Sequence, residues 1–389
     1  MKGTLKSGAK SKYARKILVV TQFTISIALI IGSIIVFAQL RFLRNVNLGF
    51  NKEQVVIISS VQQVTQNYEA FKNELLQSTE IKYVTAMDYV LGVNHNTYPL
   101  FIEGLDQEKP FFYPALIVRH DFIEVFDIEI LEGRGFSKEF ATDTVQAIII
   151  NEALAQSLSW TNKEAIGKSM KRDGDERVIG VMKNFNALSL HKPPSPFFID
   201  MVRNPNNAIF QVRYLAIRVN STNYVNVLQH IEDKWKQFAP TRPFEYSFLD
   251  KEIDALYKNE EKFGEFSIIL TFLTIFIASL GLIGLTSFLA EQRTKEIGIR
   301  RALGSSVIDI VKLISKEFII LIVISNLIAW PLAYFVIDDW LQNFSKQIPI
   351  SASYFIVSGV IALFIALLIS GHRAIKSTRV NPASILKYE

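Results

Sequence analysis

The 389-residue chain contains no cysteine, which excludes disulfide bonds, thiolate metal sites and cysteine nucleophiles. Its five histidines are scattered, with no HExxH motif or paired spacing, so the sequence supports no metal centre. There is no GxSxG motif, and the Gly167-Lys168-Ser169 run lacks the glycine that a P-loop requires at position 162, where Asn162 stands. We therefore expect no catalytic residue, no cofactor and no metal in this chain.

Acidic and basic side chains are absent from the centres of four long apolar runs, and a helix that spans a bilayer needs about 20 such residues. The sequence therefore predicts four transmembrane helices, at Ile17–Leu40, Phe266–Ala290, Phe318–Ile337 and Tyr354–Gly371. The first run is longer than the roughly 7–15 apolar residues of a signal peptide and is followed by no A-x-A site, so we interpret it as a retained anchor.

Basic residues concentrate beside these runs. The segment Arg41–Glu265 holds 25 of the 42 Lys and Arg but 30 of the 37 Asp and Glu, so the basic excess lies in the flanks. Basic flanks at the N-terminus, at 290–317 and at the C-terminus alternate with the less basic 338–353 loop. The positive-inside rule then places both termini and 290–317 in the cytoplasm and Arg41–Glu265 outside. The basic balance gives no reason to propose nucleic-acid binding.

The segment outside the membrane mixes strand-like and helix-like runs. The strand-like runs are "QVVIIS", "FFYPALIVR", "VQAIII", "RVIGVM", "PFFIDMV" and "RYLAIRV". The helix-like runs are "YEAFKNELLQS", "NEALAQSLSW" and "YVNVLQHIEDKWKQFAP", the second with Asn151 as a suitable N-cap. Interleaved strands and helices predict an α/β or α+β extracytoplasmic domain.

Two of the spans are expected to continue beyond the lipid. No proline or cluster of helix-breaking residues occurs from Tyr13 to Val46, which corresponds to about 51 Å of helix. The segment before the second span, "DKEIDALYKNEEKFGEF", also lacks proline and places Ile253, Leu256 and Tyr257 near helical spacing. These features predict a helical stalk that carries the external domain, whereas a flexible linker would be richer in Gly, Ser and Pro.

Small residues recur every four positions in two of the spans. Thr24, Ala28 and Gly32 form one stripe, and a second comprises Ser358, Ala362, Ala366 and Ser370. Such stripes favour close helix packing in lipid, although chance in spans rich in Ala, Gly and Ser is the alternative. Asn326 in the third span is expected to make a hydrogen bond between helices rather than to bind a substrate.

The charged segment "EQRTKEIGIRRALGSS" lies between the second and third spans. We predict a helix over Glu291–Ser306 at the cytoplasmic surface, with Ile299, Ala302 and Leu303 on one face, and Gly304 suits its C-terminus. Ser306 followed by Asp309 is typical of a capping box that opens the next helix. A loop that only binds anionic lipid would explain the basic residues but not the acids or the glycines. The candidate coupling residues are Glu291, Arg293, Glu296, Gly298, Arg300, Arg301 and Gly304.

This segment resembles the signature of the FtsX/MacB-type ABC transporter permeases, of the Bacteroidetes type. The resemblance extends over most of the chain, through "RKILVVTQFTISIALIIGSIIVFAQLRFLRN", "GRGFS", "AIIINEALAQSL", "IGKSMK", "RVIGVMKNFNALSLH", "PFEYSFLDKEIDALY" and "NPASILKYE". It implies one four-helix half with a MacB-like periplasmic core domain in the bacterial inner membrane. It also implies a cytoplasmic ABC ATPase dimer that binds ATP and docks on 291–306, a second permease half that is identical or paralogous, and a possible periplasmic adaptor or lipoprotein.

The resemblance further implies mechanotransmission: ATP-driven motion of the coupling helix would reach the periplasmic domains to export or extract a substrate that the sequence does not identify. The chain has one half where many relatives have two, and its first residues are similar to the linker between halves. An extracytoplasmic sensor and a membrane-bound periplasmic enzyme are the alternatives, and the absence of a cytoplasmic signalling domain or a catalytic constellation argues against each.

The expected organisation follows the order of these segments. It comprises a cytoplasmic N-terminus (1–16), the first transmembrane helix and stalk (17–46), the periplasmic domain (47–249), the second stalk and transmembrane helix (250–290), the coupling helix (291–306), the third transmembrane helix (307–337), a periplasmic loop (338–353), the fourth transmembrane helix (354–372) and a cytoplasmic tail (373–389).

Overall fold

The computed structural model describes residues 5–106, 108–187, 193–203, 211–220, 223–293, 296–297, 299–300 and 303–377. The chain divides into two compact units. The helical unit comprises Met1–Leu43, Asn259–Asn343 and Gln347–Glu389, and the α/β unit comprises Arg44–Lys258 with Phe344–Lys346.

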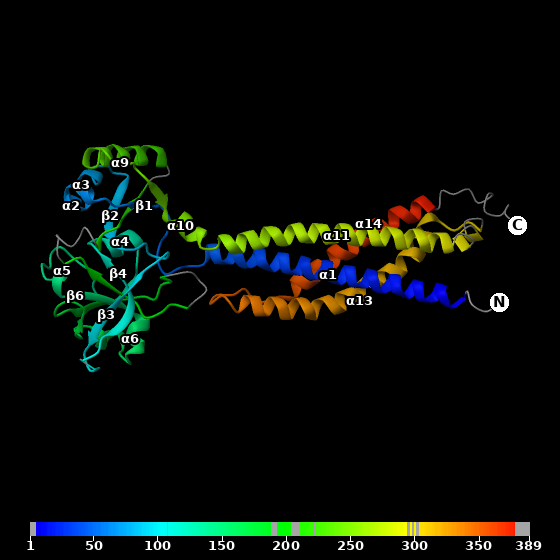
Figure 1. Ribbon diagram of the computed structural model, residues 1–389, viewed down its shortest axis with the longest axis horizontal. Helices are drawn as coiled ribbons and strands as arrows, with labels where there is room; N and C mark the ends of the chain where they lie inside the picture. Colours follow the sequence, from blue (N-terminus) through cyan, green and yellow to red (C-terminus); the bar gives the residue numbers. More distant parts are fainter. Residues whose placement is uncertain are drawn as a thin grey trace. The chain divides into compact units, whose positions relative to one another are not determined.

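The helical unit contains four helices that are long and apolar enough to cross a membrane, which confirms the four predicted spans. They are α1 (Leu5–Asn45), α11 (Lys258–Gln292), α13 (Val307–Leu341) and α14 (Ala352–Ser377). The start of α1, the end of α11 and the end of α14 lie at the same end of this unit (Figure 1). This alternation is the one that the charge pattern predicts. The third helix extends to Leu341, so the expected 338–353 loop begins later than predicted.

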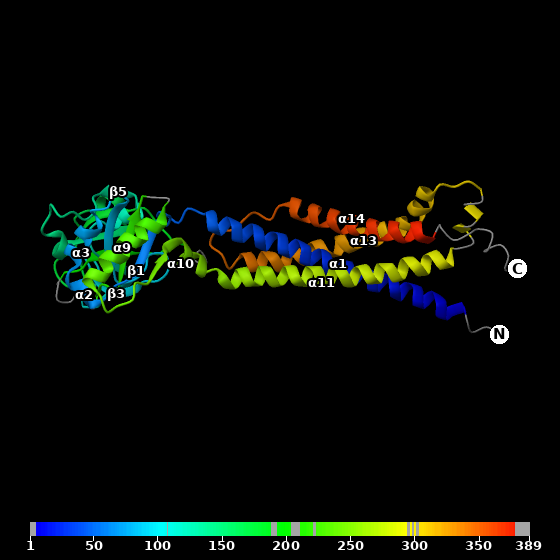
Figure 2. The ribbon, with the colours of Figure 1, turned by 90° about the horizontal axis from the view of Figure 1, so that it is seen from above.

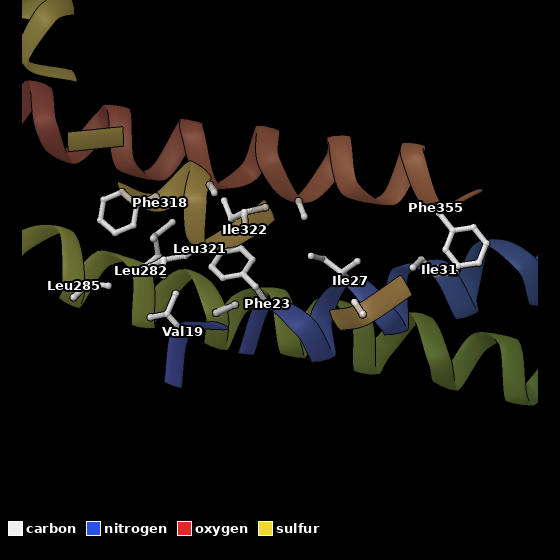
Figure 3. Close-up of a cluster of buried hydrophobic side chains, with 14 of the residues drawn as sticks. Val19, Phe23, Ile27, Ile31, Leu282, Leu285, Phe318, Leu321, Ile322 and Phe355 are labelled. Atoms are coloured by element: carbon white, nitrogen blue, oxygen red, sulfur yellow. The ribbon is translucent and has the colours of Figure 1, made fainter. Parts of the chain in front are cut away.

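Helix α1 lies at the centre of the helical unit. Its most apolar stretch is 61% buried, against 17–28% for the other three helices. Val19, Phe23, Ile27 and Ile31 point into a cluster with side chains from α11, α13 and α14 (Figure 3). The outward faces of the other helices keep their apolar side chains exposed, as at Phe272 of α11 and Phe364 of α14. In water such exposure is costly, so these surfaces require lipid or another protein.

The two small-residue stripes have different surroundings. The α14 stripe is buried throughout, and Ser370 lies 3.3 Å from Ser315 of α13, so close packing is confirmed there. On α1 the prediction is wrong at Gly32, because a Cβ at Gly32 would meet no atom within 4 Å. Instead, Gly32 lines an apolar cavity of about 300 Å³ within the helical unit.

Asn326 does not make the expected hydrogen bond between helices. Its side chain donates to the carbonyl of Ile322 and accepts from Trp330, and both partners are on α13 itself. Its contact with another helix is steric: a Cβ at Gly359 of α14 would lie 2.6 Å from the Asn326 Oδ1. Backbone carbonyls within the same helix are always within reach, so the amide is satisfied locally.

The α/β unit is built on one continuous mixed sheet, which confirms the predicted fold class (Figure 1). The strand order is β11-β1-β10-β2-β4-β9-β6-β8-β5, with β3 paired to β4 and to β7. The strands are β1 (Val55–Ser59), β2 (Ile81–Met87), β3 (Asn96–Ile102), β4 (Phe111–Val118), β5 (Ile130–Gly133), β6 (Ala147–Asn151), β7 (Met170–Lys171), β8 (Arg177–Met182), β9 (Phe198–Met201), β10 (Tyr214–Val219) and β11 (Tyr246–Phe248).

Helices cover this sheet in two groups, and each group closes its own core. The first group is α2 (Gln62–Gln66), α3 (Tyr68–Leu75) and α9 (Tyr224–Phe238), which pack Phe71 and Trp235 against β1, β10 and β2. Figures 1 and 2 show α2, α3 and α9 together on one side of the unit. The second group is α6 (Glu152–Ser157) and α7 (Asn162–Ala165), whose buried side chains pack with those of β6 and β8. The other short helices are α4 (Phe122–Phe126), α5 (Asp143–Gln146) and α10 (Leu249–Ala255). The predicted N-cap of α6 is confirmed, because Asn151 Oδ1 accepts from the Leu154 N–H at 2.9 Å.

The structure confirms the first of the two predicted stalk helices but not the second. Helix α1 is continuous to Asn45, within one residue of the prediction. The second stalk is wrong as a single helix, because α10 ends at Ala255 and α11 begins at Lys258. Between them, the N–H groups of Leu256 and Tyr257 donate to carbonyls three residues back, at 3.1 Å each. Ile253 and Tyr257 are buried, so tertiary packing fixes a tight turn that helical spacing alone does not reveal.

Candidate functional site

The candidate coupling residues lie between α11 and α13. Glu291 is the penultimate residue of α11, so the helix that we predicted over Glu291–Ser306 does not begin as a separate element there. Helical hydrogen bonds then join the Ile297 N–H to the Arg293 carbonyl and the Leu303 N–H to the Ile299 carbonyl. Two of the predicted residues, Gly298 and Arg301, lie outside the described residues, as does Ala302.

The end of this segment has the geometry that the sequence predicts. Gly304 has φ +90°, a left-handed conformation that residues with a Cβ rarely adopt. The Ser305 N–H donates to the Arg300 carbonyl at 2.9 Å, which is the hydrogen bond of a Schellman C-cap. Ser306 and Asp309 then form the predicted capping box at the start of α13. The chain therefore turns sharply between two helical segments, with a C-cap at the end of the first and a capping box at the start of the second.

An ion network holds this segment to α13 and α1. Glu317 of α13 accepts a hydrogen bond from Arg293 at 2.7 Å and forms a salt bridge with Lys16 of α1 at 3.1 Å. The neighbouring Arg15 places its guanidinium 4.0 Å from the centre of the Phe288 ring of α11. Sequence reasoning did not single out Glu317, although an isolated acid at the start of an apolar span is a recognisable signal. The network joins α1, the segment and α13 at one end of the unit.

The outer surface of the segment combines charge with exposed apolar side chains. Glu296 and Arg300 form an ion pair at 2.8 Å, one turn apart, and both are exposed or half-exposed. Leu303 is 81% exposed and Ile299 is 53% exposed, whereas Ile297 is buried in the helical core. One apolar residue therefore holds the segment in place, while two others lie on its outer surface. An exposed apolar patch bordered by charges is typical of a protein interface.

The α/β unit contains buried acids, but they are engaged in structural contacts. Asp88 accepts from the Tyr98 hydroxyl at 2.7 Å and from two backbone N–H groups, and burial raises its pKa to about 6. Asp200 accepts from the Arg172 guanidinium at 2.6 Å, and burial raises its pKa to about 6 as well. Both carboxyls are at most 2% exposed, so neither is placed to reach a substrate. In the part of the chain that the structure describes, no group of three or more acids or histidines could hold a metal ion.

Comparison with known proteins gives matches over both units. The MacB-like periplasmic core domain family matches residues 18–230, and the FtsX-like permease C-terminal family matches residues 268–382. The chain is 23% identical over 356 residues to an uncharacterised ABC transporter permease, YvrN, of Bacillus subtilis (strain 168). The match covers 86% of this chain and 82% of that protein.

Two solved structures are similar to part of this chain. The periplasmic region of MacB from Actinobacillus actinomycetemcomitans has 14% identity and a TM-score of 0.39, and the match covers 54% of this chain and 94% of that one. The extracellular domain of the noncanonic ABC-type transporter YknZ from Gram-positive bacteria has 14% identity and a TM-score of 0.34, over 50% of this chain and 97% of that one.

Proposed function

The chain belongs to the FtsX/MacB-type ABC transporter permeases, and from this we propose that residues 291–306 dock on a separate cytoplasmic ABC ATPase whose ATP-driven motion they transmit to the α/β unit. The observation that carries the proposal is the exposed apolar pair Ile299 and Leu303 on a charged segment anchored by Glu317. A docking surface that is held rigidly on spanning helices can pass displacement to them, whereas a flexible loop would absorb it.

The proposed orientation places both termini and 291–306 in the cytoplasm and the α/β unit in the periplasm of a multi-pass inner-membrane protein. The basic flanks support it, since six Lys and Arg lie before Ile17 and six more between Ala290 and Glu317. The absence of natural cysteine makes the orientation directly testable, because one introduced cysteine is a unique reporter.

The mechanical path that we propose runs mainly through α1. This helix is unbroken from Leu5 to Asn45, is the most buried of the four, and its Lys16 bonds the same Glu317 that anchors the docking segment. The path through α11 includes the turn at Leu256 and Tyr257, which is hydrogen-bonded and compact but is not a continuous helix. Transmission is therefore expected to depend more on α1 than on α11.

A second permease half, identical or paralogous, is part of the proposal. The exposed apolar side chains of α11, among them Phe266, Phe272 and Phe276, form a surface that a partner helix or lipid must cover. The work performed on the periplasmic side is export or extraction, and an adaptor or lipoprotein is an expected partner there. We propose no catalytic role for this chain itself, because ATP would be bound and hydrolysed by the ATPase subunits.

The test uses a photo-crosslinking amino acid at position 303 in the full-length protein, with position 225 as the matched control. Val225 in the α/β unit is 76% exposed, close to the value for Leu303. We expect Leu303 to crosslink to a protein that binds ATP and Val225 not to do so. In the same membranes, Leu303→Asp should weaken co-purification of that ATPase by about tenfold or more, since burial of one leucine contributes about 1.5–3 kcal/mol.

Single-cysteine variants at 303 and 112 complete the test, because Phe112 is also well exposed, at 64%, but lies in the α/β unit. An impermeant maleimide added to intact cells, or to spheroplasts where an outer membrane is present, should label position 112 and leave position 303 unlabelled until the membrane is broken. The reverse labelling pattern would show that the docking segment cannot meet a cytoplasmic ATPase.

A further inference from the structure

A cavity of about 690 Å³ lies in the α/β unit beside the end of α1. Every residue that lines it belongs to the α/β unit, from Arg44 and Asn45, which end α1, to Lys346. Gly49, one of the lining residues, has φ +88° and packs on the backbone of Asn184 and Phe185. A Cβ at Gly49 would lie 2.6 Å from the Asn184 carbonyl oxygen, so the chain can pass this closely only with glycine.

The lining chemistry is strongly polar and slightly basic. Three carboxylates, Glu53, Asp127 and Glu129, face four cations, which are Arg44, Lys52, Lys183 and Lys346. Lys183 bonds Glu129 at 2.7 Å, and this carboxylate raises the pKa of Lys183. The Lys52 side chain is 15% exposed, and among the described residues its ammonium makes only long contacts, at 3.4 Å to the Arg44 carbonyl and 3.8 Å to Asp254. A largely buried ammonium with such distant partners can accept a closer anion.

One buried polar atom in this cavity has no partner. Asn186 is 4% exposed, and its Oδ1 accepts no hydrogen bond from the part of the chain that the structure describes, although its backbone N–H donates to the Leu48 carbonyl at 2.8 Å. A buried acceptor without a donor is costly, so the site is complete only when something supplies an N–H or O–H group. The occupant should therefore combine an anion for Lys52 with a hydrogen-bond donor for Asn186.

The position of the cavity along α1 indicates where such an occupant comes from. The apolar run of α1 ends at Leu40, and Arg44 is one turn later, about 6 Å along the same helix. The polar layer of a bilayer extends about 5–8 Å beyond the hydrocarbon on each side. Arg44 therefore lies at the depth of the phospholipid headgroups. Phe50, the one aromatic residue of the lining, is buried at 7% exposed, so no open ring is present for a sugar to stack on.

We propose that this cavity binds the headgroup of a membrane phospholipid, with the phosphodiester at Lys52 and Lys183 and a headgroup donor at Asn186. The donor is the ammonium of phosphatidylethanolamine or a hydroxyl of phosphatidylglycerol. Phosphatidylcholine has the phosphate but no N–H or O–H group, so it should bind less tightly. The bound lipid would tie the end of α1 to the α/β unit, independently of any ATPase.

The experiment measures lipid binding to the delipidated full-length chain in detergent, by native mass spectrometry and by the thermal unfolding midpoint. The probes share the same acyl chains: phosphatidylethanolamine, phosphatidylglycerol, phosphatidylcholine and diacylglycerol. Soluble sn-glycerol 3-phosphate is the fifth probe. We expect phosphatidylethanolamine and phosphatidylglycerol to bind more tightly than phosphatidylcholine, and diacylglycerol to bind least.

Two variants separate the parts of the site. Lys52→Gln should lower the affinity for all three lipids that contain phosphate by about tenfold, which is the loss expected for one charge-assisted hydrogen bond. Asn186→Ala should abolish only the preference of the site for phosphatidylethanolamine and phosphatidylglycerol over phosphatidylcholine. In the absence of lipid it should not lower the unfolding midpoint, because it removes an unsatisfied buried acceptor. Lys82→Gln is the matched control, since Lys82 is an exposed lysine on β2, outside the cavity.

Equal binding of diacylglycerol and phosphatidylethanolamine would overturn the headgroup site. Equal binding of phosphatidylcholine and phosphatidylethanolamine to the unaltered protein would overturn the role of Asn186. Full reproduction of the effect by sn-glycerol 3-phosphate would assign the site to a soluble phosphate ligand and overturn the lipid. Co-purification with the ATPase is measured in parallel, so a failure here with normal docking would contradict this inference alone.

Discussion

The two units of the molecule differ in where their charged side chains pair. The α/β unit contains buried ion pairs beside exposed ones: the Arg172 and Asp200 side chains are 4% and 2% exposed, whereas those of Lys171 and Asp175 are 47% and 80% exposed. In the helical unit, the described ion pairs lie at one end of the helices and stay in contact with solvent, as for Arg300 and Glu296 at 50% and 41%. Buried pairs are costly to break, whereas exposed pairs contribute little to stability.

This difference indicates what each unit's charges are for. The buried charges of the α/β unit come from distant parts of the sequence and fix how its strands and loops pack. Glu176, for example, is fully buried, accepts from three backbone N–H groups and pairs with Arg203. The charges of residues 291–306 contribute little to stability, which the apolar core provides, and they remain available to a partner.

The largest effect is expected at Asp200. Asp200→Ala leaves the buried Arg172 guanidinium without its closest carboxylate, and the free energy of unfolding should fall by about 3–5 kcal/mol. Urea unfolding followed by tryptophan fluorescence measures it. Asp175→Ala is the control, because Asp175 pairs with Lys171 while 80% exposed, and it should leave the unfolding curve unchanged. Equal losses for the two variants would remove the contrast between buried and exposed pairs.

The second effect concerns pH and Asp88. Burial raises the pKa of Asp88 from 3.8 to about 6, so the folded state favours the protonated acid. The stability that this provides is complete below about pH 4 and is lost as the pH rises through 6; a shift of about two units corresponds to about 3 kcal/mol. Asp88→Asn keeps an acceptor for the Ile117 N–H and should abolish this part of the pH dependence. The check is the difference in unfolding free energy between variant and parent from pH 4 to 8; a constant difference would contradict it.

A smaller effect on stability is expected at Glu317. Glu317→Gln removes the charge that Arg293 and Lys16 share, but these side chains are 22–31% exposed, so the unfolding free energy should fall by only about 1 kcal/mol. Coupling should suffer more, because Arg293 no longer fixes the docking segment. The measurement is the rate of ATP hydrolysis by the assembled complex, with the permease's unfolding midpoint measured alongside. A large loss of stability with normal hydrolysis would place Glu317 among the structural charges instead.

The smallest stability effect is expected at Arg300. Arg300→Gln breaks an exposed pair one helical turn apart, which contributes about 0.3–0.5 kcal/mol. The affinity of this variant for the ATPase should nevertheless fall measurably, because the proposed interface includes the Arg300 charge. Binding of purified ATPase to the permease in nanodiscs provides the readout, and Lys171→Gln in the α/β unit is the matched control. Unaltered affinity would limit the interface to Ile299 and Leu303.

Local signals in the sequence correctly predicted the turn that ends the candidate coupling segment. Gly304 is in the left-handed conformation and the Ser306–Asp309 capping box forms, because both features depend on residues within one helical turn. The sequence placed Ile299 and Leu303 on one face, but neither the exposure of both residues nor the burial of Ile297 follows from that pattern. Glu317 escaped prediction because its partners, Arg293 and Lys16, are 24 and 301 positions away in the sequence.

The sequence by itself determined the four spans, the alternating charge of their flanks and the α/β character of the segment between them, because hydropathy, charge and strand patterns are properties of short windows. Only the tertiary structure decided that α1 occupies the centre of the helical unit, that the second stalk turns at Leu256–Tyr257, and that a basic cavity with the unpaired Asn186 lies beside the end of α1. Each of these depends on which distant surfaces pack together, and burial of that kind leaves no periodic trace in a single sequence.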